Sequence, residues 1–102
     1  MSAGNNGGVN TVISRNDVAQ RYELHLDGRL ASFTEFRREG DTVVMPHTFT
    51  VQRFRDQGLS EQLLQFALDD IREQGLTVVP TCWRVREFID EHPEYQPMVA
   101  SR

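Results

Sequence analysis

The segment Arg55–Ser60 contains residues whose types and order could bind a phosphate group; they are Arg55, Asp56, Gln57, Gly58, Leu59 and Ser60. The segment lies between a strand-like run and a long amphipathic run, and its glycine favours a turn that opens a helix. The first N–H groups of a helix have no partner inside the helix, and the dipole adds partial positive charge there. A phosphate or pyrophosphate therefore suits this turn. The alternative is an ordinary helix start without a ligand.

Cys82 and His47 are the two side chains that could take part in catalysis. The Cys82 thiol could act as a nucleophile if a nearby cation, such as Arg84 or a protonated His47, favoured the thiolate. A free cysteine after an apolar run is equally typical of a small buried side chain. His47 could accept a proton from an amine or a thiol near neutral pH. That role depends on its lying next to Cys82 across neighbouring strands, because a lone histidine on an apolar face is commonly a core residue.

Residues 11–51 are predicted to form an antiparallel meander that helps to position these groups. Apolar and polar residues alternate as in half-buried strands, and the predicted strands are Thr11–Ser14, Tyr22–Leu26, Leu30–Arg37 and Thr42–Val51. Asp27-Gly28 predicts a two-residue hairpin turn, and Gly40-Asp41 predicts another turn. The last strand is expected to carry one face made of Val43, Met45, His47, Phe49 and Val51.

From residue 59 onward the apolar residues recur with the period of a helix. Its broad apolar face suits packing on a sheet and comprises Leu59, Leu63, Leu64, Phe66, Ala67, Leu68 and Ile71. We expect Gly75 to end this helix, and a short apolar strand, Leu76–Pro80, to complete a βαβ unit with a right-handed crossover. A last helix is predicted over Arg84–His92, ended by Pro93.

This order of elements would place the candidate residues close together. The strand that contains His47 and the strand that leads to Cys82 should be parallel neighbours. The 55–60 turn would then lie at the carboxyl edge of the sheet, where ligands of open α/β sheets bind.

Length, charge and cysteine content limit the classes of protein to consider. The 102 residues predict one domain over residues 11–102, after a glycine- and asparagine-rich tail, residues 1–10, that is expected to be disordered. A formal net charge of −4 argues against nucleic-acid binding. No membrane span or secretory signal is recognisable and the single cysteine fits a reducing compartment, so we expect a cytoplasmic monomer. Three histidines and one cysteine lack metal-ligand spacing, so no metal is expected.

Four motifs in sequence order resemble a known family. They are His47-Thr48, the segment Arg55–Ser60, Pro80-x-Cys82-x-x-Val85 and His92-Pro93-Glu94-Tyr95. Together they are similar to the small single-domain GNAT-like N-acetyltransferases, the YjdJ type or N-acetyltransferase-domain-containing-1 type, over roughly residues 12–95. The resemblance implies an α/β (α+β) minimal GNAT fold: an antiparallel meander, a βαβ unit and a short C-terminal helix. It also implies acetyl-CoA as cosubstrate, bound where two parallel strands separate.

The resemblance also implies roles for individual residues of this sequence. Backbone groups near Phe49 and Thr50 would pair with the pantetheine arm, the N–H groups of residues 55–60 would hold the pyrophosphate, and Cys82 and His47 would lie near the thioester. The chain also departs from the family pattern. Asp56 replaces a glycine, Ser60 replaces a glycine or alanine, Thr50-Val51 replaces Val-Pro, and Trp83-Arg84 replaces Pro-Phe.

The function predicted from these observations is acetyl transfer from acetyl-CoA to an amine, either directly or through Cys82. The acceptor is a small molecule or a protein lysine that the sequence does not identify. The alternative is a non-enzymatic acyl-CoA-binding or sensor module on the same fold, or an interaction domain that no longer binds CoA. The short chain, which leaves little protein for an acceptor pocket, and the acidic residue in the phosphate turn favour that alternative.

Overall fold

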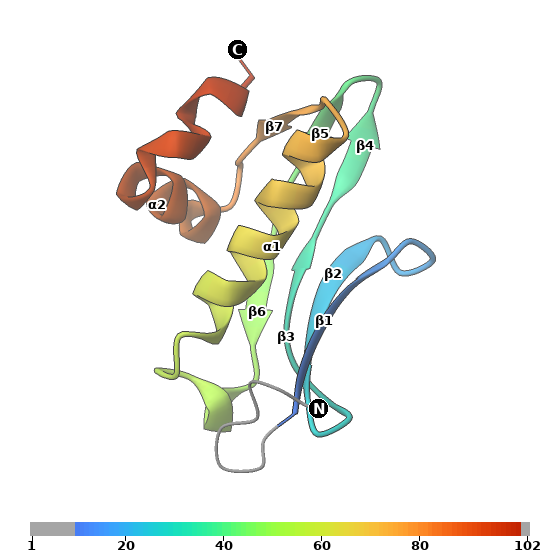
Figure 1. Ribbon diagram of the computed structural model, residues 1–102, viewed down its shortest axis with the longest axis vertical. Helices are drawn as coiled ribbons and strands as arrows, with labels where there is room; N and C mark the ends of the chain where they lie inside the picture. Colours follow the sequence, from blue (N-terminus) through green and yellow to red (C-terminus); the bar gives the residue numbers. More distant parts are fainter. Residues whose placement is uncertain (1–9, 101–102) are drawn as a thin grey trace.

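The computed structural model of the protein describes residues 10–100, in which two β-sheets pack against one long helix (Figure 1). The strands are β1 (Thr11–Asn16), β2 (Arg21–Leu26), β3 (Arg29–Glu35), β4 (Arg37–Glu39), β5 (Thr42–Val44), β6 (Thr48–Thr50) and β7 (Thr77–Val79). The helices are α1 (Leu59–Glu73) and α2 (Trp83–Glu91), with 3-10 segments η2 (Gln52–Phe54) and η3 (Pro93–Met98). Of the predicted tail, residues 1–9 lie outside the described residues.

The first sheet is antiparallel, with the strand order β1-β2-β3-β6. Its central hairpin turns at Asp27 and Gly28, whose φ angles are +50° and +83°. Positive φ at both positions is what a type I′ turn requires, and such a turn matches the twist of the two strands. The predicted hairpin is therefore confirmed.

The second sheet has the order β4-β5-β7, and β5 and β7 are parallel. The turn predicted at Gly40-Asp41 joins β4 to β5. The single strand predicted over Thr42–Val51 is wrong, because this segment divides into β5 and β6, which belong to different sheets. Pro46 lies at the division, and a proline has no N–H with which to continue a strand ladder.

The predicted parallel pair is present as β5 and β7, but the segment that contains His47 does not belong to it. Backbone bonds continue beyond β5 and β7 from the Met45 N–H to the Val79 carbonyl, at 3.1 Å, and from the Cys82 N–H to the Met45 carbonyl, at 3.0 Å. After Met45 the chain turns toward β3, so β6 and the segment that follows β7 separate. In Figure 1, β6 lies beside the N-terminal end of α1, whereas β5 and β7 lie toward its C-terminal end.

Helix α1 buries the predicted face with one exception, since Phe66 is 39% exposed. The Phe66 ring instead approaches the ring of Tyr22 edge-on, with centroids 6.2 Å apart. The helix ends as predicted at Gly75, whose φ is +75°. Bonds from the Gly75 N–H to the Arg72 carbonyl, at 2.9 Å, and from the Leu76 N–H to the Ile71 carbonyl, at 3.2 Å, form a Schellman motif.

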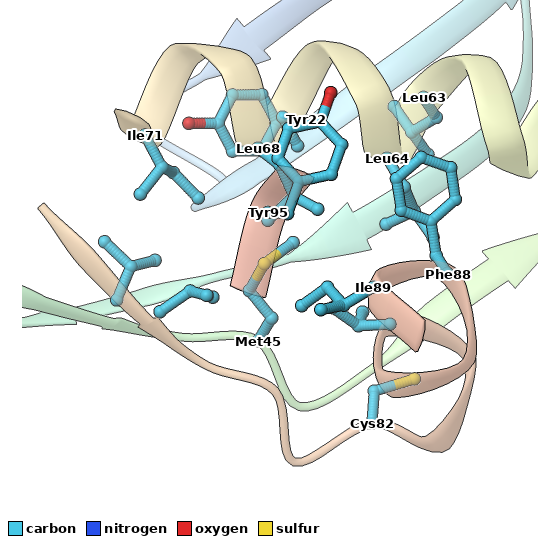
Figure 2. Packing of buried hydrophobic residues seen from close by; sticks show 14 of the residues in the cluster. Tyr22, Met45, Leu63, Leu64, Leu68, Ile71, Cys82, Phe88, Ile89 and Tyr95 are labelled. Carbon is cyan, nitrogen blue, oxygen red and sulfur yellow. The ribbon is translucent and has the colours of Figure 1, made fainter. Parts of the chain in front are cut away.

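Helix α2 begins one residue before its predicted start and ends before Pro93. The 3-10 segment η3 that follows was not predicted. It adds Tyr95 (Figure 2) and also Met98 to the core. His92 stacks on Phe88, with ring centroids 4.0 Å apart, and its Nδ1 lies 2.8 Å from the Phe88 carbonyl. These contacts give His92 a structural role.

No helix within residues 10–100 is long and apolar enough to span a membrane.

Candidate ligand-binding pocket

A pocket of about 710 Å³ opens between β6, the 55–60 turn and the first turns of α1 and α2. Its lining residues are Thr48, Phe49, Thr50, Phe54, Arg55, Asp56, Gly58, Leu59, Ser60, Glu61, Trp83, Arg84 and Glu87. Seven of the eight predicted ligand-binding residues are in this set, and Gln57 is the exception. The candidate catalytic residues Cys82 and His47 are not part of the lining.

The turn before α1 has the backbone geometry that an anion site needs. Gly58 immediately precedes the helix with φ +73°, and no side chain caps the helix there. The Gly58 carbonyl accepts the Gln62 N–H at 3.3 Å, while the N–H groups of the first turn are left for solvent or a ligand. Asp56 also has a positive φ, +66°, which only glycine adopts without strain and which aspartate tolerates.

The opposite end of the pocket is the free edge of β6, the last strand of its sheet. The Val51 N–H donates to the Ala31 carbonyl at 2.8 Å, and the Glu35 N–H donates to the His47 carbonyl at 2.8 Å. Alternate residues of an antiparallel strand bond to the same neighbour, so Phe49 also pairs with β3. The backbone groups of Thr48 and Thr50 consequently point away from β3, toward the pocket.

That alternation changes the predicted contacts of the strand. The backbone groups that point away from β3 belong to Thr48 and Thr50, whereas the backbone of Phe49 is used within the sheet. The Thr50 carbonyl already accepts the Arg55 Nε at 3.2 Å. This bond ties the 55–60 turn to the edge of β6.

Hydroxyl groups cover the face of the sheet behind the pocket. The Thr48 Oγ1 lies 2.8 Å from the Oγ1 of Thr34, and the Thr50 Oγ1 lies 2.9 Å from the Oγ of Ser32. Ser32 and Thr34 are fully buried, and each has a partner, so the polar wall carries no desolvation penalty from unpaired groups. This wall could not be predicted from the sequence, because serine and threonine are common in exposed strands.

The structure does not bring Cys82 and His47 together. The Cys82 thiol donates to the Thr48 Oγ1 at 3.7 Å and is 8% exposed, at the margin of the core (Figure 2). His47 precedes Thr48 and therefore points to the opposite face of the strand. There its exposed ring faces Phe33, with centroids 6.1 Å apart. The shared apolar face predicted for residues 43–51 is likewise wrong beyond Met45, since His47 and Phe49 are exposed.

The first turn of α2 contributes Trp83 and Arg84 to the pocket lining. Trp83 is 64% exposed at the rim. The Arg84 guanidinium donates to the Ser60 Oγ through Nε, at 3.2 Å, and Nη2, at 3.0 Å, and to Glu87 through Nη1, at 3.1 Å. The one available signal was the departure from the family pattern at residues 83 and 84. Within residues 10–100 no group of histidine, cysteine, aspartate and glutamate side chains is arranged to hold a metal.

Residues 21–98 match the family described as GCN5-related N-acetyl-transferase. The chain belongs to this family. A solution structure of a GCN5-like protein from Staphylococcus aureus has a TM-score of 0.69 at 15% identity and covers 89% of each chain. The α/β (α+β) GNAT fold is therefore confirmed for this chain.

Two larger proteins share the same fold over part of their length. The ribosomal-protein-S18-alanine N-acetyltransferase from Escherichia coli has a TM-score of 0.57 at 20% identity over 59% of this chain. The N-acetylglutamate synthase from Neisseria gonorrhoeae, complexed with coenzyme A and N-acetyl-glutamate, has a TM-score of 0.55 at 21% identity over 72%. The chain spans 39% and 19% of the lengths of these two proteins. No curated protein sequence matched the chain.

Proposed function

We propose that the chain transfers the acetyl group of acetyl-CoA to an amine. The observation that carries this proposal is the continuity of the pocket from the uncapped first turn of α1 to the free edge of β6. A matching ligand has phosphate at one end and amide groups at the other, and coenzyme A has both. Membership in the N-acetyltransferase family supports the same ligand.

Two parts of the chain would hold the ligand. The backbone N–H groups of residues 55–60, Gln57 included, would donate to the pyrophosphate. Thr48 and Thr50 would pair with the pantetheine amides as an added strand does, while Phe49 forms part of the pocket wall. Bound acetyl-CoA supplies an activated thioester, and no metal is needed for its reaction with an amine.

Transfer is proposed to be direct, without an acetylated cysteine. The Cys82 thiol is buried, donates to the Thr48 Oγ1 and does not itself line the pocket. Cys82 would then shape the thioester end through Thr48. His47 would accept the proton of an amine that arrives from the exposed face of the sheet, beside Phe33.

Calorimetry with acetyl-CoA, followed by intact mass of the same sample, tests both the ligand and the route. The chain contains no lysine, so a stable gain of one acetyl group would lie on Cys82 or on the N-terminal amine. We expect binding, no acetyl group on Cys82 and retained turnover in Cys82→Ala. Binding together with a mass gain that Cys82→Ala abolishes would replace direct transfer with a thiol intermediate. Absence of binding at large excess would overturn the proposed ligand.

A second candidate function is acyl-CoA binding without catalysis. It is favoured by the position of Cys82 and His47, neither of which lines the pocket. If the chain is instead a transferase, its acceptor would be cationic, because the net charge of −4 attracts amines at long range. Release of free CoA thiol with an amine panel, compared with acetyl-CoA alone, separates the two functions. Amine-dependent release identifies a transferase, and binding without release identifies the acyl-CoA-binding module.

A further inference from the structure

The Arg84 guanidinium makes unusual use of its hydrogen-bonding capacity. Two of its nitrogens, Nε and Nη2, both donate to the single hydroxyl oxygen of Ser60, at 3.2 and 3.0 Å. This edge of a guanidinium is shaped to bind two oxygens of one phosphate or carboxylate. A third bond, from Nη1 to Glu87, measures 3.1 Å. Arginine has five N–H donors, so two have no partner among residues 10–100.

The position of Arg84 relates these donors to the phosphate turn. Ser60 is the second residue of α1, so its hydroxyl lies beside the uncapped N–H groups of that helix. The Arg84 side chain is 19% exposed and lines the pocket. Low exposure strengthens a charge-assisted bond, because the surrounding dielectric constant is lower than that of water.

The acidic residues around the 55–60 turn explain why a positive charge at Arg84 would favour ligand binding. Asp56, Glu61 and Glu87 all line the same pocket, and a pyrophosphate placed there would be repelled by their carboxylates. Arg55 and Arg84 are the cations in the lining. Arg55 is exposed and its Nε is used by the Thr50 carbonyl, which leaves Arg84 as the partly buried positive charge on the opposite wall.

We propose that Arg84 binds the pyrophosphate of the ligand from the α2 side of the pocket, and that Glu87 weakens this contact by competing for the same guanidinium. The inference rests on the proposed function, because it assumes that the pocket takes a CoA ester. Ser60 holds the guanidinium over the turn before the ligand arrives. The phosphate then receives backbone donors from α1 and side-chain donors from α2.

The test compares affinities for CoA and dephospho-CoA, which lacks the 3′-phosphate, by calorimetry. Arg84→Met should weaken both ligands by about 10- to 100-fold, the usual value of a hydrogen bond to a charged group. Arg84→Lys should restore only part of the affinity, because lysine lacks the planar fork. Glu87→Gln should tighten both ligands by a few-fold and should flatten the dependence of binding on salt.

The outcomes separate failure of this inference from failure of the proposed function. Wild-type protein that binds neither ligand contradicts the proposed function and the inference with it. If the wild type binds and Arg84→Met binds equally well, the inference alone is overturned. A loss of affinity for CoA but not for dephospho-CoA also overturns it, because Arg84 would then contact the 3′-phosphate. Melting of each unliganded variant is the folding control. If Arg84→Met is unstable, the affinity of Glu87→Gln for the two ligands decides instead. Tighter binding supports the proposed competition between Glu87 and the phosphate, and unchanged affinity contradicts it.

Discussion

The two ends of α1 differ in how their polar groups are satisfied. At the C-terminal end Asp70 accepts bonds from the Tyr22 hydroxyl and the Arg15 Nη1, each at 2.7 Å. Asp69 accepts the Tyr95 hydroxyl at 2.8 Å. At the N-terminal end Gly58 supplies no side-chain cap, and the neighbouring N–H groups face a pocket.

This difference assigns the two ends separate tasks. Carboxylates near the C-terminus of a helix are disfavoured by the helix dipole, so Asp69 and Asp70 need the donors that β1, β2 and η3 bring. Their bonds fasten the helix to both sides of the fold. The N-terminal end has the opposite imbalance, because its N–H donors have no acceptor within the helix and are left for solvent or a ligand. We therefore expect one end of the helix to contribute stability and the other end to contribute the proposed ligand binding.

The largest effect is expected for Asp70→Ala, which should leave the fold weakened and the pocket intact. The buried Tyr22 hydroxyl would lose its acceptor, at a cost of about 2–3 kcal/mol, and the melting temperature should fall by roughly 10–20 °C. Affinity for acetyl-CoA at a temperature below both transitions should stay within about twofold of wild type. Glu73→Ala, at an exposed position of the same helix, is the matched control. If Asp70→Ala instead lost affinity for acetyl-CoA and kept its melting temperature, the C-terminal end would contribute to binding and not to stability.

Gly58→Val should give the opposite pattern. A β-branched side chain at φ +73° strains the turn by about 1–3 kcal/mol and keeps the backbone from approaching a phosphate. We expect at least about a 100-fold loss of acetyl-CoA affinity, or roughly 2.7 kcal/mol. Gly40→Val is the control, because Gly40 also has a positive φ, +64°, and open space around its Cβ position, but lies in the β4–β5 turn. Equal affinities in the two variants would show that the 55–60 turn does not bind the ligand.

The C-terminal end should also impose a pH dependence on stability. Burial and the bond to Asp70 raise the pKa of Tyr22, and burial and the bond to Asp69 raise the pKa of Tyr95 to about 12. Unfolded tyrosine ionises near pH 10, so the stabilisation is fully present below pH 10 and is lost as pH rises toward 12. The loss should be about 1.4 kcal/mol per pH unit for each tyrosine.

Urea unfolding between pH 8 and pH 11.5 measures this slope. The chain has two tyrosines and no lysine, so few other groups titrate in that range. The double variant Tyr22→Phe, Tyr95→Phe should remove most of the slope, and acetyl-CoA affinity at neutral pH should not change. A slope that persists in the double variant would contradict the assignment to these hydroxyls.

The smallest effects are expected for Asp56, in the N-terminal turn. Asp56→Gly should relieve the positive φ, for a gain of about 0.5–1 kcal/mol, and should remove a negative charge near the phosphate. Asp56→Asn keeps the tolerance for this conformation and removes only the charge. Both variants should tighten CoA binding by a few-fold, but only the glycine variant should raise the melting temperature. Weaker binding in both would mean that Asp56 itself contacts the ligand.

Local features of the sequence predicted much of the fold. The φ values of Asp27 and Gly28 and the Schellman motif at Gly75 are properties of a few adjacent residues, and the periodicity of α1 and α2 lies within each helix. The family match confirms the fold class that these elements and the four motifs suggested. The segment η3 was missed because two prolines mark it as irregular chain, whereas its burial depends on contacts between Tyr95 and α1.

The sequence by itself determined the hairpins, the helices, the glycine-containing turn before α1 and the family. Each of these depends on conformational preferences or motifs within short stretches of chain. Only the tertiary structure decided that residues 42–51 divide between two sheets, that Thr48 separates His47 from Cys82, and that Arg84 reaches Ser60. The reason is that strand partners and faces are chosen by residues distant in the sequence, and a shift of one residue moves a side chain to the opposite face.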